Sequence, residues 1–114
     1  MDRPQARLPA DPRLTVVPVA DGGEGALTLA LSGELDVHTV DTLCAVAISR
    51  IHEGRRHLRL DFTQVTWCDN ASLFALLGLR AALHAADGSL GFTAFSKAID
   101  ESITRNGLGH EFRP

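Results

Sequence analysis

Two short apolar segments near the start of the chain alternate in the way that β-strands do. In Ala26 to Ser32, three leucines share one face and smaller residues share the other. Leu14 to Val19 is rich in β-branched residues, and Pro18 cannot donate a ladder hydrogen bond, which favours an edge strand. The turn-like sequence ADGGEG at 20–25 joins the two segments. Together they predict an antiparallel hairpin.

Helical and strand-like patterns alternate along the rest of the chain. Gly33 to Val37 interrupts the strand pattern, and an amphipathic helix follows, with Thr39 as its predicted N-cap and Gly54 at its end. The later elements are strands at Leu58 to Phe62 and Leu90 to Phe95, a strongly apolar helix at about Asn70 to Ala86, and a helix capped by Ser96 that runs to about Asn106. A helix that carries the chain from one strand to the next favours a parallel crossover.

The predicted order is therefore β-β-α-β-α-β-α, a single-domain α/β fold with a mixed sheet and helices mainly on one face. The chain has 114 residues, enough for one core. Residues 1–13 carry three prolines and predict a flexible leader, so the folded domain should span 14–114. The helix at about 70–86 is apolar around more than half of its circumference. This indicates either deep packing against the sheet or an exposed docking face, and it leaves self-association open.

Net charge and hydropathy argue against several classes of protein. The net charge of -3 argues against the positive field that non-specific nucleic-acid binding requires. No apolar run approaches the roughly 20 residues of a membrane-spanning helix. The first residues also lack the apolar stretch of a secretory signal. We therefore expect a cytoplasmic domain that has no nucleic-acid partner.

Residue patterns typical of catalysis or metal binding do not stand out. No serine lies in G-x-S-x-G, and the glycines at 22–25 lie in a hairpin turn rather than between a strand and a helix. The five histidines lack metal-ligand spacing. Cys44 and Cys68 do not form a C-x-x-C pair and are expected to be reduced core residues. We expect no enzymatic activity, no metal and no cofactor.

The most informative stretch is Val65 to Leu73, where a strand delivers Asp69 and Asn70 to the start of the apolar helix. A helix N-terminus offers unpaired N–H groups and the positive end of the helix dipole, so it would accommodate a phosphate on a side chain. The simpler interpretation is that Asp69 or Asn70 is an ordinary N-cap. The spacing alone leaves both interpretations open.

Five segments in order resemble the STAS domain family, and specifically its anti-sigma factor antagonists (anti-anti-sigma factors). They are GELDV at 33–37, LRLDFTQVTWCD at 58–69, ASLFALLGLRAAL at 71–83, ADGSLGFTAF at 86–95 and IDESITRNGLGHEF at 99–112. The resemblance implies a sheet of four or five strands with helices on one side, and a bacterial protein that is not an enzyme. Such proteins regulate transcription by partner switching: they bind an anti-sigma factor that is also a serine kinase, and so release the sigma factor.

In that family the kinase inactivates the antagonist by phosphorylating a serine at the head of the second helix, in the motif D-S-[ST]-G-L. Here Asp69 matches the aspartate, Asn70 stands in the place of the acceptor serine, Ala71 follows, Ser72 replaces the glycine and Leu73 matches the leucine. Asparagine is not a substrate of a serine kinase, and it is neutral, so it does not imitate the charge of phosphoserine.

Three hypotheses follow from this departure. The domain is an antagonist without the phosphorylation switch, or Ser72 has taken over as acceptor, or the domain is a scaffold or a sensor of a nucleotide or small ligand that has lost partner switching. In the last case Trp67 and Cys68 could line a pocket, although such strand residues are more often buried. The partner-binding residues are predicted to be Asp36, Asp69, Asn70 and Ser72.

Overall fold

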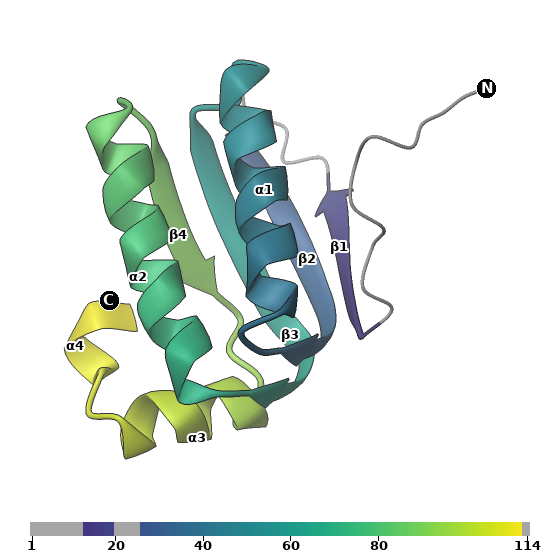
Figure 1. Ribbon diagram of the computed structural model, residues 1–114, viewed down its shortest axis with the longest axis vertical. Coiled ribbons are helices and arrows are strands. Elements are labelled where there is room, and N and C mark those ends of the chain that lie inside the picture. The colour runs from purple at the N-terminus through teal and green to yellow at the C-terminus, as the bar shows by residue number, and fades with distance from the viewer. Residues whose placement is uncertain (1–12, 20–25, 113–114) are drawn as a thin grey trace.

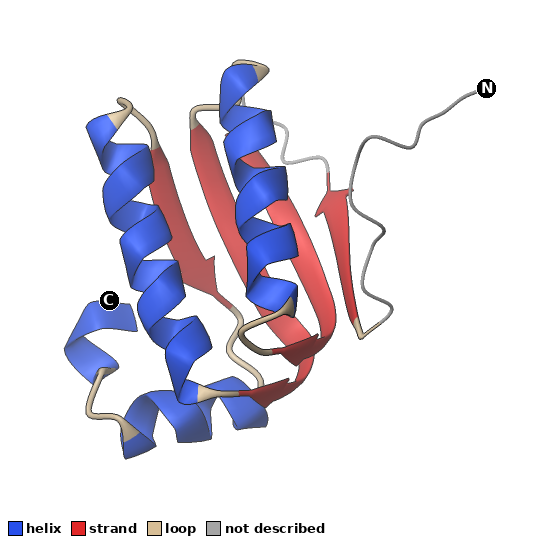
Figure 2. Ribbon diagram, in the orientation of Figure 1, coloured by secondary structure: helices blue, strands red, loops and turns tan. Residues whose placement is uncertain are grey.

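The computed structural model describes residues 13–19 and 26–112, and its elements are arranged as two layers (Figure 1). The strands are β1 (Leu14–Val19), β2 (Ala26–Leu35), β3 (His57–Cys68) and β4 (Ser89–Thr93). The helices are α1 (Thr39–His52), α2 (Asn70–Ala85), α3 (Lys97–Arg105) and α4 (Gly109–Phe112). Figure 2 shows α1 and α2 lying side by side over one face of the sheet. The predicted α/β class and order are confirmed, with the short α4 as an addition.

The four described strands form one mixed sheet in the order β1-β2-β3-β4. β1 and β2 are antiparallel, with Leu14 opposite Gly33 and Val19 opposite Thr28. The predicted hairpin is therefore confirmed, and β1 is an edge strand, as Pro18 requires; the turn at 20–25 and the leader at 1–12 lie outside the described residues. β2 with β3, and β3 with β4, are parallel pairs. α1 and α2 are the crossovers between them, as predicted.

Two strands run further than the sequence pattern predicts, and irregular pairing interrupts the alternation of β3. β2 continues through Gly33 to Leu35, and its register against β3 shifts twice, between Ala30 and Ser32 and between Gly33 and Glu34. Gly33 has a φ of +114°, and a Cβ there would lie 2.0 Å from the carbonyl oxygen of Arg13. A residue with a side chain would therefore clash with the residue that precedes β1. After β2, residues 36–38 lead to the start of α1.

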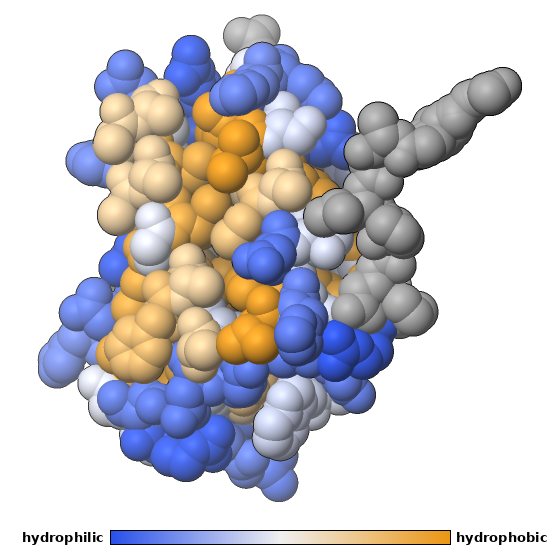
Figure 3. All heavy atoms as spheres, in the orientation of Figure 1, coloured by the Kyte–Doolittle hydropathy of each residue, from blue (hydrophilic) through white to orange (hydrophobic). Residues whose placement is uncertain are grey.

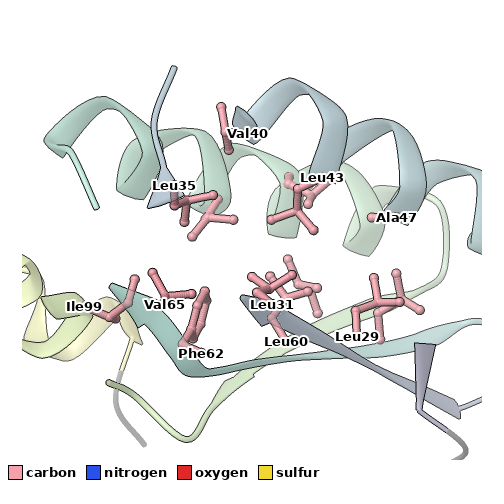
Figure 4. Close-up of a cluster of buried hydrophobic side chains, with 14 of the residues drawn as sticks. Leu29, Leu31, Leu35, Val40, Leu43, Ala47, Leu60, Phe62, Val65 and Ile99 are labelled. Carbon is pink, nitrogen blue, oxygen red and sulfur yellow. The ribbon is translucent and has the colours of Figure 1, made fainter. Parts of the chain in front are cut away.

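The core lies between the sheet and the two long helices (Figure 4). Leu29 and Leu31 of β2 and Leu60 and Phe62 of β3 point from the sheet towards Leu43 of α1. All five of these side chains are almost fully buried. Because successive strand residues face opposite sides, their alternation gives the sheet one buried face and fixes its register. The start of α2 is therefore packed against a rigid sheet.

The C-terminal segment closes the end of the molecule below α2. The side chain of Ser96 accepts a hydrogen bond from the Ile99 N–H, which confirms it as the N-cap of α3. α3 packs against β3 through Ile99 and Ile103, both fully buried. Phe112 of α4 lies 4.7 Å from Phe92 between ring centroids. This packing brings the C-terminal end of α3 close to the start of α2, as Figure 1 shows.

Among the described residues, no helix is both long enough and apolar enough to cross a membrane.

Candidate functional site

The start of α2 is organised by the carboxylate of Asp69, which is its N-cap. Oδ1 accepts hydrogen bonds from the Ser72 N–H at 2.8 Å and from the Ser72 hydroxyl at 2.6 Å. Oδ2 accepts one from the N–H of Val37, at 3.2 Å, in the loop that follows β2. The Asp69 N–H donates in turn to the carbonyl of Leu35 at 3.1 Å. Asp69 thus caps one helix and fastens the loop before the other.

The start of α1 is organised by a second aspartate, Asp36. Its Oδ1 accepts the N–H groups of His38 at 2.8 Å and Thr39 at 3.0 Å, and its carbonyl accepts the Val40 N–H at 2.9 Å. Asp36 therefore performs the N-cap role that the sequence assigned to Thr39. The prediction was wrong because the hydroxyl of Thr39 is already occupied: it accepts the Asp36 N–H and donates to the carbonyl of Glu34.

The charged form of Asp36 is stabilised in the folded protein. The hydrogen bond from the Thr39 N–H is the largest cause that lowers the pKa of this carboxyl, followed by the bond from the His38 N–H and the nearby charge of Arg13. Partial burial acts in the opposite direction and does not overcome these effects. Arg13 lies 2.5 Å from Oδ2. Asp36 is therefore held in place as an anion at neutral pH.

Asn70, in the place where the resemblance puts the phosphoacceptor, is exposed at the first position of α2. Its side-chain oxygen accepts a hydrogen bond of 2.9 Å from the amide of Asn106. The same Asn106 amide donates to the carbonyl of Ser102 at 2.8 Å, at the C-terminal end of α3. Asn70 thus links the start of α2 to the end of α3. Asn106 was not among the predicted site residues, since no local pattern signals a contact over 36 residues.

Ser72 lies one turn into α2 and faces inward. Its side chain is fully buried, and its hydroxyl donates to Asp69. A kinase needs access to the hydroxyl oxygen, and the covalently attached phosphate would need room and solvent. In this conformation Ser72 offers neither. The geometry therefore argues against both roles proposed for Ser72, that of alternative acceptor and that of partner contact.

Three large apolar side chains are exposed at this end of the molecule. Val37, Trp67 and Phe74 have exposed fractions of 47%, 55% and 55%. The expectation that Trp67 is buried was wrong, whereas the neighbouring Cys68 is buried as expected, with 3% exposed. Strict alternation from Leu60 through Phe62 to Cys68 would have placed Trp67 on the outer face. Each of these apolar residues lies within four positions along the chain of one of the polar residues Asp36, Asp69 and Asn70.

Nothing in the described part of this site has the chemistry of a catalytic centre. Burial, with a smaller contribution from the charge of Asp69, raises the pKa of the Cys68 thiol to about 12, so it is not a thiolate nucleophile at neutral pH. Both cysteines are free. Within residues 13–19 and 26–112, no group of three or more His, Cys, Asp or Glu side chains could hold a metal ion. What the site offers is a set of polar groups that are at least partly exposed, with exposed apolar side chains close to them in the sequence.

Solved structures of several proteins share this fold. The anti-sigma factor antagonist SpoIIAA in its unphosphorylated form is 22% identical, with a TM-score of 0.67 and 84% of each chain covered. An anti-sigma factor antagonist from Mycobacterium paratuberculosis is 20% identical, with a TM-score of 0.65, covering 91% of this chain and 87% of that one. The Bacillus cell fate determinant SpoIIAA in its phosphorylated form is 21% identical, with a TM-score of 0.62, covering 84% and 86%.

The sequence itself places the chain in a family. The family model described as "Mlab, STAS domain" matches residues 20–114, which is most of the chain. The STAS resemblance predicted from the ordered segments, and the fold that it implied, are both confirmed. This chain belongs to the Mlab STAS domain family.

Proposed function

We propose that this domain is a non-enzymatic protein-binding module that engages an anti-sigma factor through the surface at the start of α2, and that serine phosphorylation does not switch it there. The single observation that carries the proposal is Asn70. It presents an exposed amide at the first position of α2, and the hydroxyl in the same turn, that of Ser72, is buried.

The fold supports a partner-binding role. SpoIIAA, which shares the fold, is named as an anti-sigma factor antagonist and occurs in unphosphorylated and phosphorylated forms. In this chain the corresponding turn is closed by hydrogen bonds from Ser72 to Asp69 and from Asn106 to Asn70. A module of this kind would remain in one state, that of the unphosphorylated antagonist, in a bacterial cytoplasm.

The exposed side chains indicate how the surface would bind. Phe74 lies one turn beyond Asn70 on α2, and Val37 lies in the loop that Asp69 fastens. Aromatic groups in a polar setting carry much of the binding energy of protein interfaces. Phe74 is therefore the expected anchor, with Asn70 beside it as a polar contact. Asp36 and Asp69 act mainly by holding this surface in shape.

The first experiment is affinity capture of the tagged full chain from the source cells, comparing the wild type with Phe74→Glu. The matched control is Val17→Glu, which changes another exposed apolar side chain, 47% exposed, on β1. We expect an ATP-binding anti-sigma factor to be lost with Phe74→Glu and retained with Val17→Glu. Equal recovery with both variants would contradict the assignment of the surface.

The absence of a switch is tested with the purified partner and labelled ATP. Wild-type protein should accept no phosphate, whereas Asn70→Ser should become labelled at position 70 if the partner is a serine kinase. Labelling of the wild type at Ser72 would overturn the proposal. The Ser72→Ala variant identifies that outcome, because it would abolish the label.

A second candidate function is that of a scaffold within a larger assembly. The chain matches a family model described as Mlab rather than as an anti-sigma factor antagonist, and it lacks an accessible acceptor hydroxyl at the start of α2. Capture of a partner that is sensitive to Phe74→Glu, but has no kinase activity towards Asn70→Ser, would favour the scaffold. A ligand-sensing role finds less support, since Trp67 is exposed and Cys68 is buried, so they do not line one pocket.

A further inference from the structure

The opposite end of the helical layer carries a second surface of different chemistry. A hollow of about 430 Å³ lies between the C-terminal halves of α1 and α2. It is lined by Ile48, Ile51, His52, Arg56, Ala82 and Leu83, together with Ala86. Figure 3 shows apolar surface exposed between the two helices towards this end. The hollow is distant from Asn70, which lies at the other end of α2.

The floor of this hollow is apolar and partly open to solvent. Ile48 is 44% exposed, while Ile51 and Leu83 beneath it are buried. The residues that the end of α2 contributes to the lining are two alanines, Ala82 and Ala86, and Leu83. Small side chains allow a second helix to approach closely, because the distance between packed helices is set by the residues at the contact. The shape therefore suits an apolar helix face.

The segment that borders the hollow on the α1 side (its rim) is basic and includes the lining residue Arg56, although the whole chain carries a net charge of -3 and Asp87 follows Ala86 on the α2 side. The segment 50–57, RIHEGRRH, contains three arginines and two histidines against one glutamate. Arg50 is paired with Glu53 at 2.9 Å. Arg55 and Arg56 donate to the main-chain carbonyls of Ala26 and Ala86. Among the described residues these carbonyls are their hydrogen-bond partners, so both charges remain available to an acidic group.

The positive charge beside the hollow favours some binding partners over others. Part of it compensates the negative ends of the α1 and α2 dipoles, and Arg56 caps a carbonyl at the end of α2. A second copy that placed the same hollow against this one would bring two basic rims together, which is unfavourable. An acidic segment would meet the rim with opposite charge. The apolar floor would at the same time bury its hydrophobic side chains.

We propose that the hollow between the C-terminal halves of α1 and α2 binds an acidic amphipathic helix of a protein partner. Apolar residues at i, i+3 or i+4, and i+7 of that helix would occupy the floor between Ile48 and Ala82. Its Asp or Glu side chains would pair with Arg55 and Arg56. The surface is independent of the one at the start of α2, so the domain would bind through both ends of α2.

The test places a photocrosslinking amino acid, benzoylphenylalanine, at Ala82 in the full chain in the source cells. Ala71 is the matched control, because it is an exposed alanine on α2 at the opposite end. The crosslinked partner peptide is then sequenced. We expect position 82 to attach to a segment with helical apolar spacing and an excess of Asp and Glu, and position 71 not to attach to that segment. Absence of a crosslink at 82, or a crosslink to a basic segment or to a second copy of this chain, would overturn the proposal.

The peptide identified in this way is synthesised and titrated against purified protein. Binding should weaken at least tenfold with Ile48→Glu and about fivefold with Arg56→Gln, and it should weaken as salt is raised from 50 to 300 mM because charge pairs are screened. The control Arg105→Gln removes an arginine from α3 and should change nothing. Salt-independent binding, or equal losses with the Arg56 and Arg105 variants, would contradict the charge pairing. Thermal unfolding of each variant confirms that the domain is folded.

Failure of this proposal would leave the proposed function intact. Phe74→Glu at the start of α2 should not affect the peptide, and Ile48→Glu should not affect the anti-sigma factor. Loss of both partners with either variant would contradict the independence of the two surfaces.

Discussion

The two long helices begin with the same four-residue pattern, Asp-x-x-Thr at 36–39 and Asp-x-x-Ser at 69–72. In each, the aspartate Oδ1 accepts the N–H of the residue three positions later, at 3.0 Å for Thr39 and 2.8 Å for Ser72. Both hydroxyl-bearing residues are fully buried. The starts of α1 and α2 are therefore built on one local rule, that of the N-cap.

The two helix starts differ in the hydrogen-bond partners of the hydroxyl group and of the second carboxylate oxygen. The hydroxyl of Thr39 bridges two main-chain groups, the Asp36 N–H and the Glu34 carbonyl, and Arg13 holds the second oxygen of Asp36. The hydroxyl of Ser72 instead donates back to the carboxylate of Asp69. The second oxygen of Asp69 reaches across to the N–H of Val37, within the first pattern. Asp36 thus fixes its own loop and ties it to Arg13 beside β1, whereas Asp69 links the starts of both helices.

The comparison predicts that Asp69 contributes more stability than Asp36. Replacing Asp69 with Ala removes the cap of α2, leaves the Ser72 hydroxyl without its acceptor, and frees the Val37 N–H. A lost cap costs about 0.5–2 kcal/mol, and a buried unsatisfied hydroxyl about 1–3 kcal/mol. We expect a total loss of about 2–3 kcal/mol, measured by urea unfolding. The Asp69→Asn control keeps one acceptor oxygen and should lose less; equal losses would show that the cap bonds contribute little.

Asp36 should give a smaller effect with a distinct pH dependence. Asp36→Asn removes the charge that the Thr39 and His38 N–H groups and Arg13 stabilise, and we expect a loss of about 1–2 kcal/mol at pH 7. The folded pKa lies below the unfolded value of about 3.9. The carboxylate therefore stabilises the fold above that value, and this contribution disappears as the pH falls through the folded pKa. The gap between wild type and variant should shrink as the pH falls below about 4.

The control for Asp36 is Asp41→Asn, which neutralises an exposed carboxylate in the first turn of the same helix. Its effect should be about 0.3–1 kcal/mol, the size of a helix-dipole interaction. A gap for Asp36→Asn that does not shrink as the pH falls below about 4 would show that packing, rather than the charge, accounts for the loss.

Ser72→Ala should cost about 1 kcal/mol, the value of one net hydrogen bond. The Asp69 carboxylate keeps the Ser72 N–H and the Val37 N–H, so no buried donor is left unpaired. Thr39→Ala should cost more, because it leaves two main-chain groups, the Asp36 N–H and the Glu34 carbonyl, without the hydroxyl between them. Chemical unfolding of both variants under one set of conditions tests this order. A larger loss for Ser72→Ala would reverse the interpretation of the two hydroxyl groups.

The local part of the site could be predicted from the sequence, and the long-range part could not. Asp69 is recognisable as a cap because a cap involves residues within one helical turn. Asn106 meets Asn70 only because α3 packs beneath α2, and no spacing in the sequence records that contact. The burial of Ser72 depends on which side of α2 faces the sheet at its first turn, a position where the apolar stripe is just beginning.

The fold was more accessible to sequence reasoning than the site, because strands and crossover helices follow from periodicity. The length of β3 was underestimated because of its irregular pairing, whereas β2 keeps its alternation through Gly33 to Leu35. The extra residue that β3 carries between Asp61 and Gln64 turns Val65 inward, out of phase with Leu60 and Phe62. The second register shift, between Val65 and Trp67, restores the original alternation, so that Cys68 is buried and Trp67 is exposed. Strict alternation therefore predicts correctly which side chains are buried at the two ends of β3, but not in its middle.

Asn70 should show the smallest effect on stability, although it holds the position most important to the proposed function. Its side chain is exposed and makes one described hydrogen bond, with Asn106, whose amide also bonds to the Ser102 carbonyl. Asn70→Ala and Asn70→Ser should therefore each change the free energy of unfolding by no more than about 0.5 kcal/mol. Because both variants remain folded, a change in partner binding or phosphorylation would report on the surface itself. A loss as large as that of Asp69→Ala would instead make Asn70 a structural residue, and its place at the start of α2 would then need no functional explanation.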